Sequence, residues 1–75
     1  MSHLKSEVAR DILSYLGKNP EASDTPEGIA KWWLGGAYSL HEVRAALAEL
    51  VEAGLVAERR GENSNVHYRK GGDAR

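Results

Sequence analysis

Apolar residues recur at every fourth position near the start of the chain, which is the spacing of one face of an α-helix. Gly17 and Pro20 follow this stripe, and both residue types favour the end of a helix. The pattern predicts a helix over residues 3–17. Its buried stripe would consist of Leu4, Val8, Ile12 and Leu16.

A second helix is predicted over residues 26–34. Thr25 offers a capping hydroxyl, Pro26 suits the first helical position, and the acidic Glu27 follows in the first turn. At about 100° per residue, Trp32 falls on the flank of the apolar face of this helix and is expected to be half exposed. The apolar face itself would consist of Ile29, Ala30 and Trp33.

The third helix is predicted over residues 40–53. Ser39 and Glu42 have the spacing of a capping box, in which each side chain bonds a backbone amide at the other position. Two consecutive glycines separate this helix from the previous one, and Gly54 is expected to end it in the left-handed conformation. The buried stripe would consist of Val43, Leu47, Leu50 and Val51.

The last part of the chain has the pattern of a β-hairpin. "LVAERR" and "NVHYRK" alternate apolar and polar residues, and the turn-rich "GENSN" lies between them. We therefore predict a two-stranded hairpin over residues 55–70 and a tail over 71–75. Together these elements predict one α+β domain over residues 1–75, mainly α, with three helices and a small hairpin. The residues facing the helices would be Val56, Val66 and Tyr68.

The composition is that of an ordinary globular domain, with 41% hydrophobic and 28% charged residues in 75 positions. The absence of cysteine excludes disulfides and thiolate chemistry. The first residues, "MSHLKSEVAR", contain no long apolar run, so we expect no signal peptide, no membrane partner and a cytoplasmic location. The net charge of −1 does not by itself favour a nucleic-acid partner, although a local basic patch can act on a neutral domain.

The residues that commonly carry catalysis do not form a recognisable site. The histidines at positions 3, 41 and 67 lack metal-ligand spacing, and no cysteine accompanies them. The serines have simpler roles as caps and turn residues, so no nucleophile–base pair is indicated. Gly35 and Gly36 lack the lysine pattern of a phosphate-binding loop. We therefore expect no enzymatic activity, no metal and no cofactor.

Three segments share the residue pattern of one known family. "TPEGIAKWW" is similar to its second helix, and "SLHEVRAALAELVEAGLV" is similar to its third helix. The basic residues, glycine-containing loop and "YR" that follow are similar to its wing. Over roughly residues 5–70 the chain resembles the winged helix-turn-helix family, as a small stand-alone member of the prokaryotic type. One departure is the turn "LGGAYS", which is longer than is usual in that family.

The resemblance implies three helices plus a C-terminal two-stranded wing, and a transcriptional regulator that binds double-stranded DNA. The third helix would enter the major groove, where Arg44 can reach a guanine edge or a phosphate. The alternative is that the polar residues of the third helix form only its solvated side, and that the charged residues of the hairpin only protect its edge against aggregation. The DNA-binding residues implied by the resemblance are Ser39, His41, Arg44, Ala45 and Ala48 on the helix, and Arg59, Arg60, Asn63, Asn65, Arg69 and Lys70 in the wing.

An alternative function is that of a protein-interaction adaptor. The acidic balance, the alanines on the third helix and the tryptophan pair favour it, because exposed tryptophans are enriched at interfaces. Trp32 and Tyr38 are the candidate interface residues, but Trp32 could instead fold over the first helix or the hairpin, with Tyr38 packed on it. Specific DNA binding by so small a domain would require a homodimer. The first helix or the Trp32 surface would supply its interface.

Overall fold

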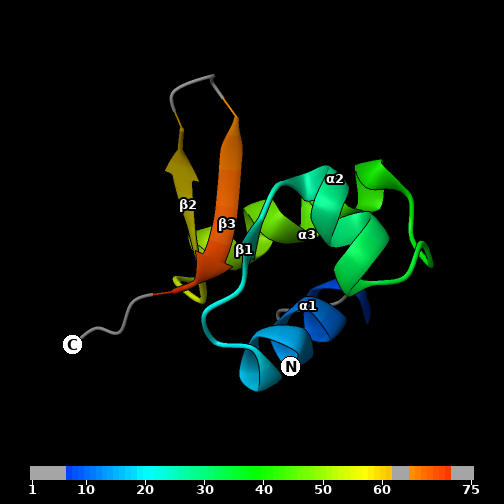
Figure 1. Cartoon of the computed structure of the whole chain (residues 1–75), viewed down its shortest axis with the longest axis horizontal. Coiled ribbons are helices and arrows are strands. Elements are labelled where there is room, and N and C mark those ends of the chain that lie inside the picture. Colours follow the sequence, from blue (N-terminus) through cyan, green and yellow to red (C-terminus); the bar gives the residue numbers. More distant parts are fainter. Residues whose placement is uncertain (1–6, 62–64, 72–75) are drawn as a thin grey trace.

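Three helical regions and a three-stranded sheet make up the computed structural model, which describes residues 7–61 and 65–71. The helices pack together on one side, and the β2–β3 hairpin extends away from them (Figure 1). The predicted α+β class is therefore confirmed. In chain order the elements are α1 (Glu7–Lys18), β1 (Ser23–Asp24), α2 (Pro26–Gly28), η1 (Ile29–Trp33), α3 (Leu40–Glu52), β2 (Val56–Arg60) and β3 (Val66–Lys70).

Parts of the sequence predictions fall outside the described residues. These are the first residues of the predicted helix 3–17, including Leu4, the hairpin residue Asn63, and residues 72–75 of the predicted tail.

The core lies where α1, η1, α3 and the start of β2 meet. The predicted stripes of α1 and α3 are confirmed, except that Val51 is half-buried and Ala46 is buried in addition. Burying a large aliphatic side chain contributes roughly 1.5–3 kcal/mol, so a small set of residues carries most of the stability. The buried core residues are Val8, Ala9, Ile12, Leu16, Ile29, Val43, Ala46, Leu47, Leu50 and Val56.

The segment predicted as one helix over 26–34 divides into a short α-helical turn and a π-helical turn. The Thr25 hydroxyl caps the first turn by accepting from the Gly28 amide at 3.1 Å. In the π turn, the Leu34 amide donates to the Ile29 carbonyl at 3.0 Å, five residues earlier. The prediction of a regular helix was therefore wrong in its second half. Local patterning could not reveal the wider turn, because π turns are rare and are recognised by their hydrogen bonds.

Glycine is required at two points around the helices. Gly36, with φ of +78°, ends the π turn in the left-handed region, and Gly54, with φ of +81°, ends α3 in the same way. The amide of Gly36 donates to the Ala30 carbonyl at 2.9 Å. Both predicted helix stops are confirmed.

The capping box at the start of α3 is confirmed by two reciprocal hydrogen bonds. The Glu42 amide donates to the Ser39 hydroxyl oxygen at 3.1 Å, and the Ser39 amide donates to the Glu42 carboxylate at 3.0 Å. These bonds satisfy two of the amides that a helix N-terminus leaves without partners. They fix the point at which α3 begins.

The predicted hairpin over residues 55–70 is confirmed as β2 paired antiparallel with β3, but the sheet has a third strand that was not predicted, in the order β1–β3–β2. The additional strand, β1, pairs Ser23 with Arg69 and Asp24 with Tyr68. It is only two polar residues long, so it has no apolar alternation from which a strand could be predicted. β1 pairs with one edge of the hairpin. This pairing connects the sheet to the segment that leads into α2.

Gly28 lies directly against the Asp24 carboxylate, and a Cβ atom at position 28 would overlap this group. The Asp24 Oδ1 atom accepts a hydrogen bond from the Thr25 amide at 2.8 Å. The end of β1 and the first turn of α2 are therefore in direct contact, and a side chain at position 28 would require the Asp24 carboxylate to shift.

Candidate nucleic-acid interface

One face of α3 is turned to solvent along its whole length. All five residues of this region that the family resemblance implies are exposed. Ala45 and Ala48 lie at the middle of the face and have no atoms beyond Cβ, so they leave it flat enough for a groove or another surface to approach the helix closely. The five exposed residues are Ser39, His41, Arg44, Ala45 and Ala48.

Arg44 is paired with an acidic side chain from the previous helical region. Its guanidinium lies 3.4 Å from the Glu27 carboxylate, and the two side chains are 59% and 62% exposed. An ion pair this exposed contributes between zero and about 1 kcal/mol, so a competing anion displaces it at little cost. The sequence pattern did not reveal this pair, because Glu27 and Arg44 are brought together only when α2 packs on α3.

The strand register divides the basic residues of the hairpin between two sides of the sheet. Arg60 lies opposite Val66 and shares a side with the buried Val56; we call this the inner side, since it faces the helices. Arg59 lies opposite His67 on the outer side. Alternation places Lys70 on the inner side and Arg69 on the outer side. The structure therefore does not bring the four basic residues together.

Tyr68 lies on the inner side of the hairpin, directly opposite Glu58. This half-buried residue packs against the core, as predicted. Burial raises its pKa, and the negative charge of Glu58 raises it further, whereas the positive charges of Arg44 and Arg60 lower it. The charges of Arg44 on α3 and Arg60 on β2 thus both act on the same phenol, although sixteen positions separate them in the sequence. Periodicity predicted the burial of Tyr68 but not these electrostatic effects.

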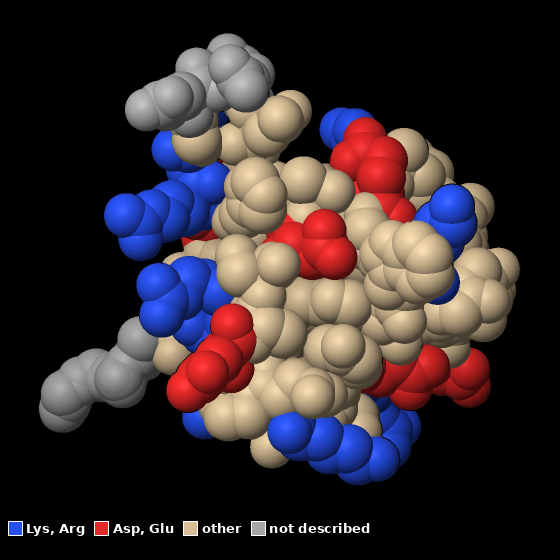
Figure 2. All heavy atoms as spheres, viewed as in Figure 1, with Lys and Arg blue, Asp and Glu red and all other residues tan. Residues whose placement is uncertain are grey.

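The outer side of the sheet carries Arg59, His67 and Arg69, with Ser23 and Ala57 on either side of Arg69. Among the described strand residues on this side there is no carboxylate. Basic side chains lie along the edge of the molecule that carries β2 and β3, and acidic side chains lie both near this edge and elsewhere on the same face (Figure 2). The hairpin is therefore the most basic part of the described chain.

Of the two candidate asparagines at the hairpin tip, Asn65 lies within the described residues. Asn65 is exposed, and its backbone carbonyl accepts from the Gly61 amide at 2.7 Å. This bond continues the pairing of β2 with β3 beyond the strand ends. The Asn65 residue itself remains exposed at the surface.

Trp32 and Tyr38 occupy different surroundings. Trp32 is 69% exposed, so the alternative in which it folds over the first helix or the hairpin was wrong, and it is more exposed than the helical spacing indicated. The Lys31 ammonium lies 5.1 Å from the centre of its ring. Tyr38 instead packs against the core, and its hydroxyl donates to the Asp11 carboxylate at 2.7 Å. Trp33 is the core member of the pair, as predicted, and stacks on Tyr15 with ring centres 4.6 Å apart.

The Tyr38–Asp11 hydrogen bond has a measurable signature. Donation to the Asp11 carboxylate, with smaller effects from desolvation and nearby acids, raises the pKa of Tyr38 from 10.0 to about 12. A raised folded-state pKa means that the bond stabilises the fold at pH values below 10, and that this contribution is lost as the pH rises toward 12. Ultraviolet absorbance follows the ionisation of the tyrosines as the pH rises, and Tyr38→Phe identifies the contribution of Tyr38. We expect Tyr38 to be the last tyrosine to ionise.

Asp11→Asn provides the control for that titration, since it removes the charge that holds the phenol neutral. We expect the pKa of Tyr38 to return toward its usual value in this variant. An unchanged titration of Tyr38 in Asp11→Asn would contradict the hydrogen bond.

Within residues 7–61 and 65–71, no group of three or more histidine, aspartate or glutamate side chains is placed to hold a metal ion. None of the described helices is long and apolar enough to span a bilayer.

No family model matches the chain, and neither the curated proteins nor the solved structures include a significant match. The assignment of a function therefore depends on the site itself.

Proposed function

We propose that this chain is a winged helix-turn-helix protein that binds double-stranded DNA and acts as a transcriptional regulator. In this proposal α3 enters the major groove and the β2–β3 hairpin contacts the phosphate backbone. The observation that carries it is the exposed face of α3, which bears Arg44, together with the basic β2–β3 hairpin, because these are the two elements that would hold the duplex. The flat middle of that face supports the same reading.

The residues at the start of α3 would have unequal roles. Arg44 is the long donor that can reach a base edge or a phosphate. His41 is exposed one turn earlier and would lie near the backbone. Ser39 already uses its hydroxyl in the capping box, and the Glu42 carboxylate beside it repels phosphate. We therefore expect Ser39 to place the helix rather than to bind DNA.

The proposed binding is local and electrostatic. A duplex must approach a protein of net charge −1, so the few basic residues of α3 and the hairpin supply the attraction. Each phosphate contact contributes about 0.9 to the slope of log affinity against log salt. With few long donors on α3, the interface favours modest sequence specificity.

A two-dimensional amide NMR titration with a random-sequence duplex tests the proposal. At low salt we expect shifts in α3 over residues 39–48 and around Arg60 and Tyr68, and we expect them to fade as salt is added. If no amide in these two regions moves at low salt, DNA binding by this domain is excluded.

Removing the acidic partner of Arg44 should strengthen DNA binding. Glu27→Gln frees the guanidinium, and the loss of an exposed ion pair worth up to about 1 kcal/mol corresponds to a roughly two- to fivefold gain in affinity. Fluorescence anisotropy with a labelled duplex measures it. Glu21→Gln is the matched control, since it removes the same charge from an exposed residue between α1 and β1. An equal gain in both variants would mean that only net charge matters.

The second candidate function is a protein-interaction adaptor that uses the surface of α2 and η1. The exposure of Trp32, at 69%, is the observation in its favour. The same titration separates the two candidates, because a protein-interaction surface at Trp32 predicts no response of α3 to DNA.

A further inference from the structure

Three basic residue types lie next to one another on the outer side of the sheet. Arg59 lies directly opposite His67, and Arg69 follows His67 two positions later on the same strand. Cross-strand neighbours are about 5 Å apart at Cβ, and residues two positions apart on one strand are separated by about 7 Å. The three side chains therefore form one compact group, which we call the outer basic patch.

The arginines of the outer basic patch are available to bind an anion. Both are exposed, and within residues 7–61 and 65–71 neither has an ion-pair partner. This distinguishes them from Arg44, which is paired with Glu27. A guanidinium can bind a phosphate group through two parallel hydrogen bonds. The patch thus offers two such donors on one side of a sheet.

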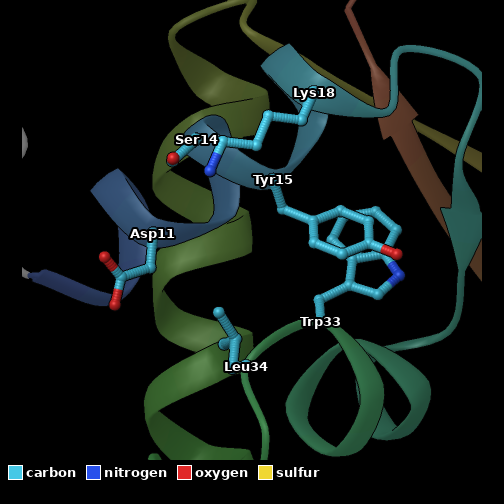
Figure 3. Close-up of a pocket in the computed structure, with 6 residues that line it drawn as sticks. All are labelled: Asp11, Ser14, Tyr15, Lys18, Trp33 and Leu34. Atoms are coloured by element: carbon cyan, nitrogen blue, oxygen red, sulfur yellow. The ribbon is translucent and has the colours of Figure 1, made fainter.

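The hollow between α1 and η1 differs from the patch in its charge. It is lined by Asp11 and Lys18, which carry opposite charges, and by the stacked rings of Tyr15 and Trp33 (Figure 3). A lining with both charges does not select the sign of its occupant. Of these two surfaces, only the outer basic patch selects an anion.

The neighbours of the patch favour a nucleic-acid backbone over a protein as the anion. The other described strand residues on this side are Ser23 and Ala57, and neither is an aromatic or large aliphatic anchor. Protein interfaces derive most of their affinity from a few such anchors. A DNA duplex instead presents one negative charge about every 1.7 Å along its axis, so basic side chains alone can hold it.

We propose that the outer basic patch binds the phosphate backbone of a second DNA duplex, so that one chain bridges two duplexes. The inference rests on the proposed function, in which the first duplex lies against α3 and the inner side of the hairpin. The sheet stands between the two duplexes, because alternate side chains of a strand point to opposite sides. The patch has few side chains and no helix that enters a groove, so it binds the second duplex more weakly than α3 binds the first.

Two histidines report separately on the two surfaces, because His41 lies on α3 and His67 lies in the outer basic patch. Their imidazole C–H signals are followed by NMR at constant pH while a random-sequence duplex is added to the full chain, and His67→Gln assigns the second signal. We expect the His41 signal to saturate first and the His67 signal to follow as more duplex is added. An unchanged His67 signal would overturn the inference. If His67 responds and His41 does not, DNA binding by α3 is excluded and phosphate binding by the patch is confirmed.

Capture of a fluorescent duplex by a second, immobilised duplex measures bridging directly. We expect the unmodified chain to join the two duplexes. The double variant Arg59→Ala and Arg69→Ala should still bind the immobilised duplex but capture about tenfold less of the fluorescent one, since two phosphate contacts are lost. The double variant Arg10→Ala and Lys18→Ala is the matched control, because it removes two exposed positive charges from α1 and should capture as much as the unmodified chain.

Circular dichroism first establishes that both double variants are folded. An unmodified chain that binds the immobilised duplex without capturing the second one would contradict bridging. Equal capture by the two double variants would also contradict it, and would indicate that two associated copies join the duplexes without the outer basic patch.

Discussion

Replacing Leu47 with alanine should lower the free energy of unfolding by about 3 kcal/mol, a large part of the stability of a domain this small. Leu47 lies on α3 and is 0% exposed, among side chains from α1, η1 and α3. Truncation removes apolar contact and leaves a cavity that helices held by their caps cannot close. Urea unfolding followed by circular dichroism measures the change.

Leu55→Ala is the matched control for Leu47→Ala, because the same atoms are removed from a partly exposed side chain. We expect it to change the free energy of unfolding by less than about 1 kcal/mol. Equal losses in the two variants would show that α3 is not held by the core described above.

Removing Arg44 and Arg60 together should weaken DNA binding far more than removing Arg59 and Arg69 together. Both double alanine variants lose two positive charges, so a difference in DNA affinity between them cannot result from net charge. The first pair lies on the exposed face of α3 and on the inner side of the hairpin, whereas the second lies on the outer side of the sheet. We expect the first variant to lose about two units of salt slope and roughly a hundredfold in affinity at low salt.

Anisotropy titrations at several salt concentrations measure both variants against one duplex. A larger loss of affinity in the Arg59 and Arg69 variant would show that DNA binds to the outer side of the sheet and not to α3. Equal losses would indicate attraction by total charge, without a defined interface.

The parts of this fold that depend on local chemistry were predictable from the sequence. The Ser39–Glu42 capping box, the Thr25 cap and the left-handed Gly54 each involve residues within four positions of one another. The apolar stripes of α1 and α3 follow from helical periodicity in the same way. Local rules decided these features, and they were correct.

Features that depend on distant residues were not predictable. β1 becomes a strand only because β3 lies beside it, and Trp32 is exposed because no described residue of α1 or the hairpin covers it. The site shows the same division. Periodicity identified the exposed face of α3, whereas the separation of Arg59 from Arg60 required the strand register, and the Glu27–Arg44 pair required the packing of two helices.

The contact between Gly28 and Asp24 has a consequence for how this sequence can vary. Any side chain at position 28 requires the Asp24 carboxylate to move, and that carboxylate also accepts the Thr25 amide at 2.8 Å. A mutation at position 28 alone therefore disturbs the end of β1 and the start of α2 at once. We therefore expect substitutions at positions 24 and 28 to be coupled, with the glycine replaced more readily once a smaller residue has replaced the aspartate.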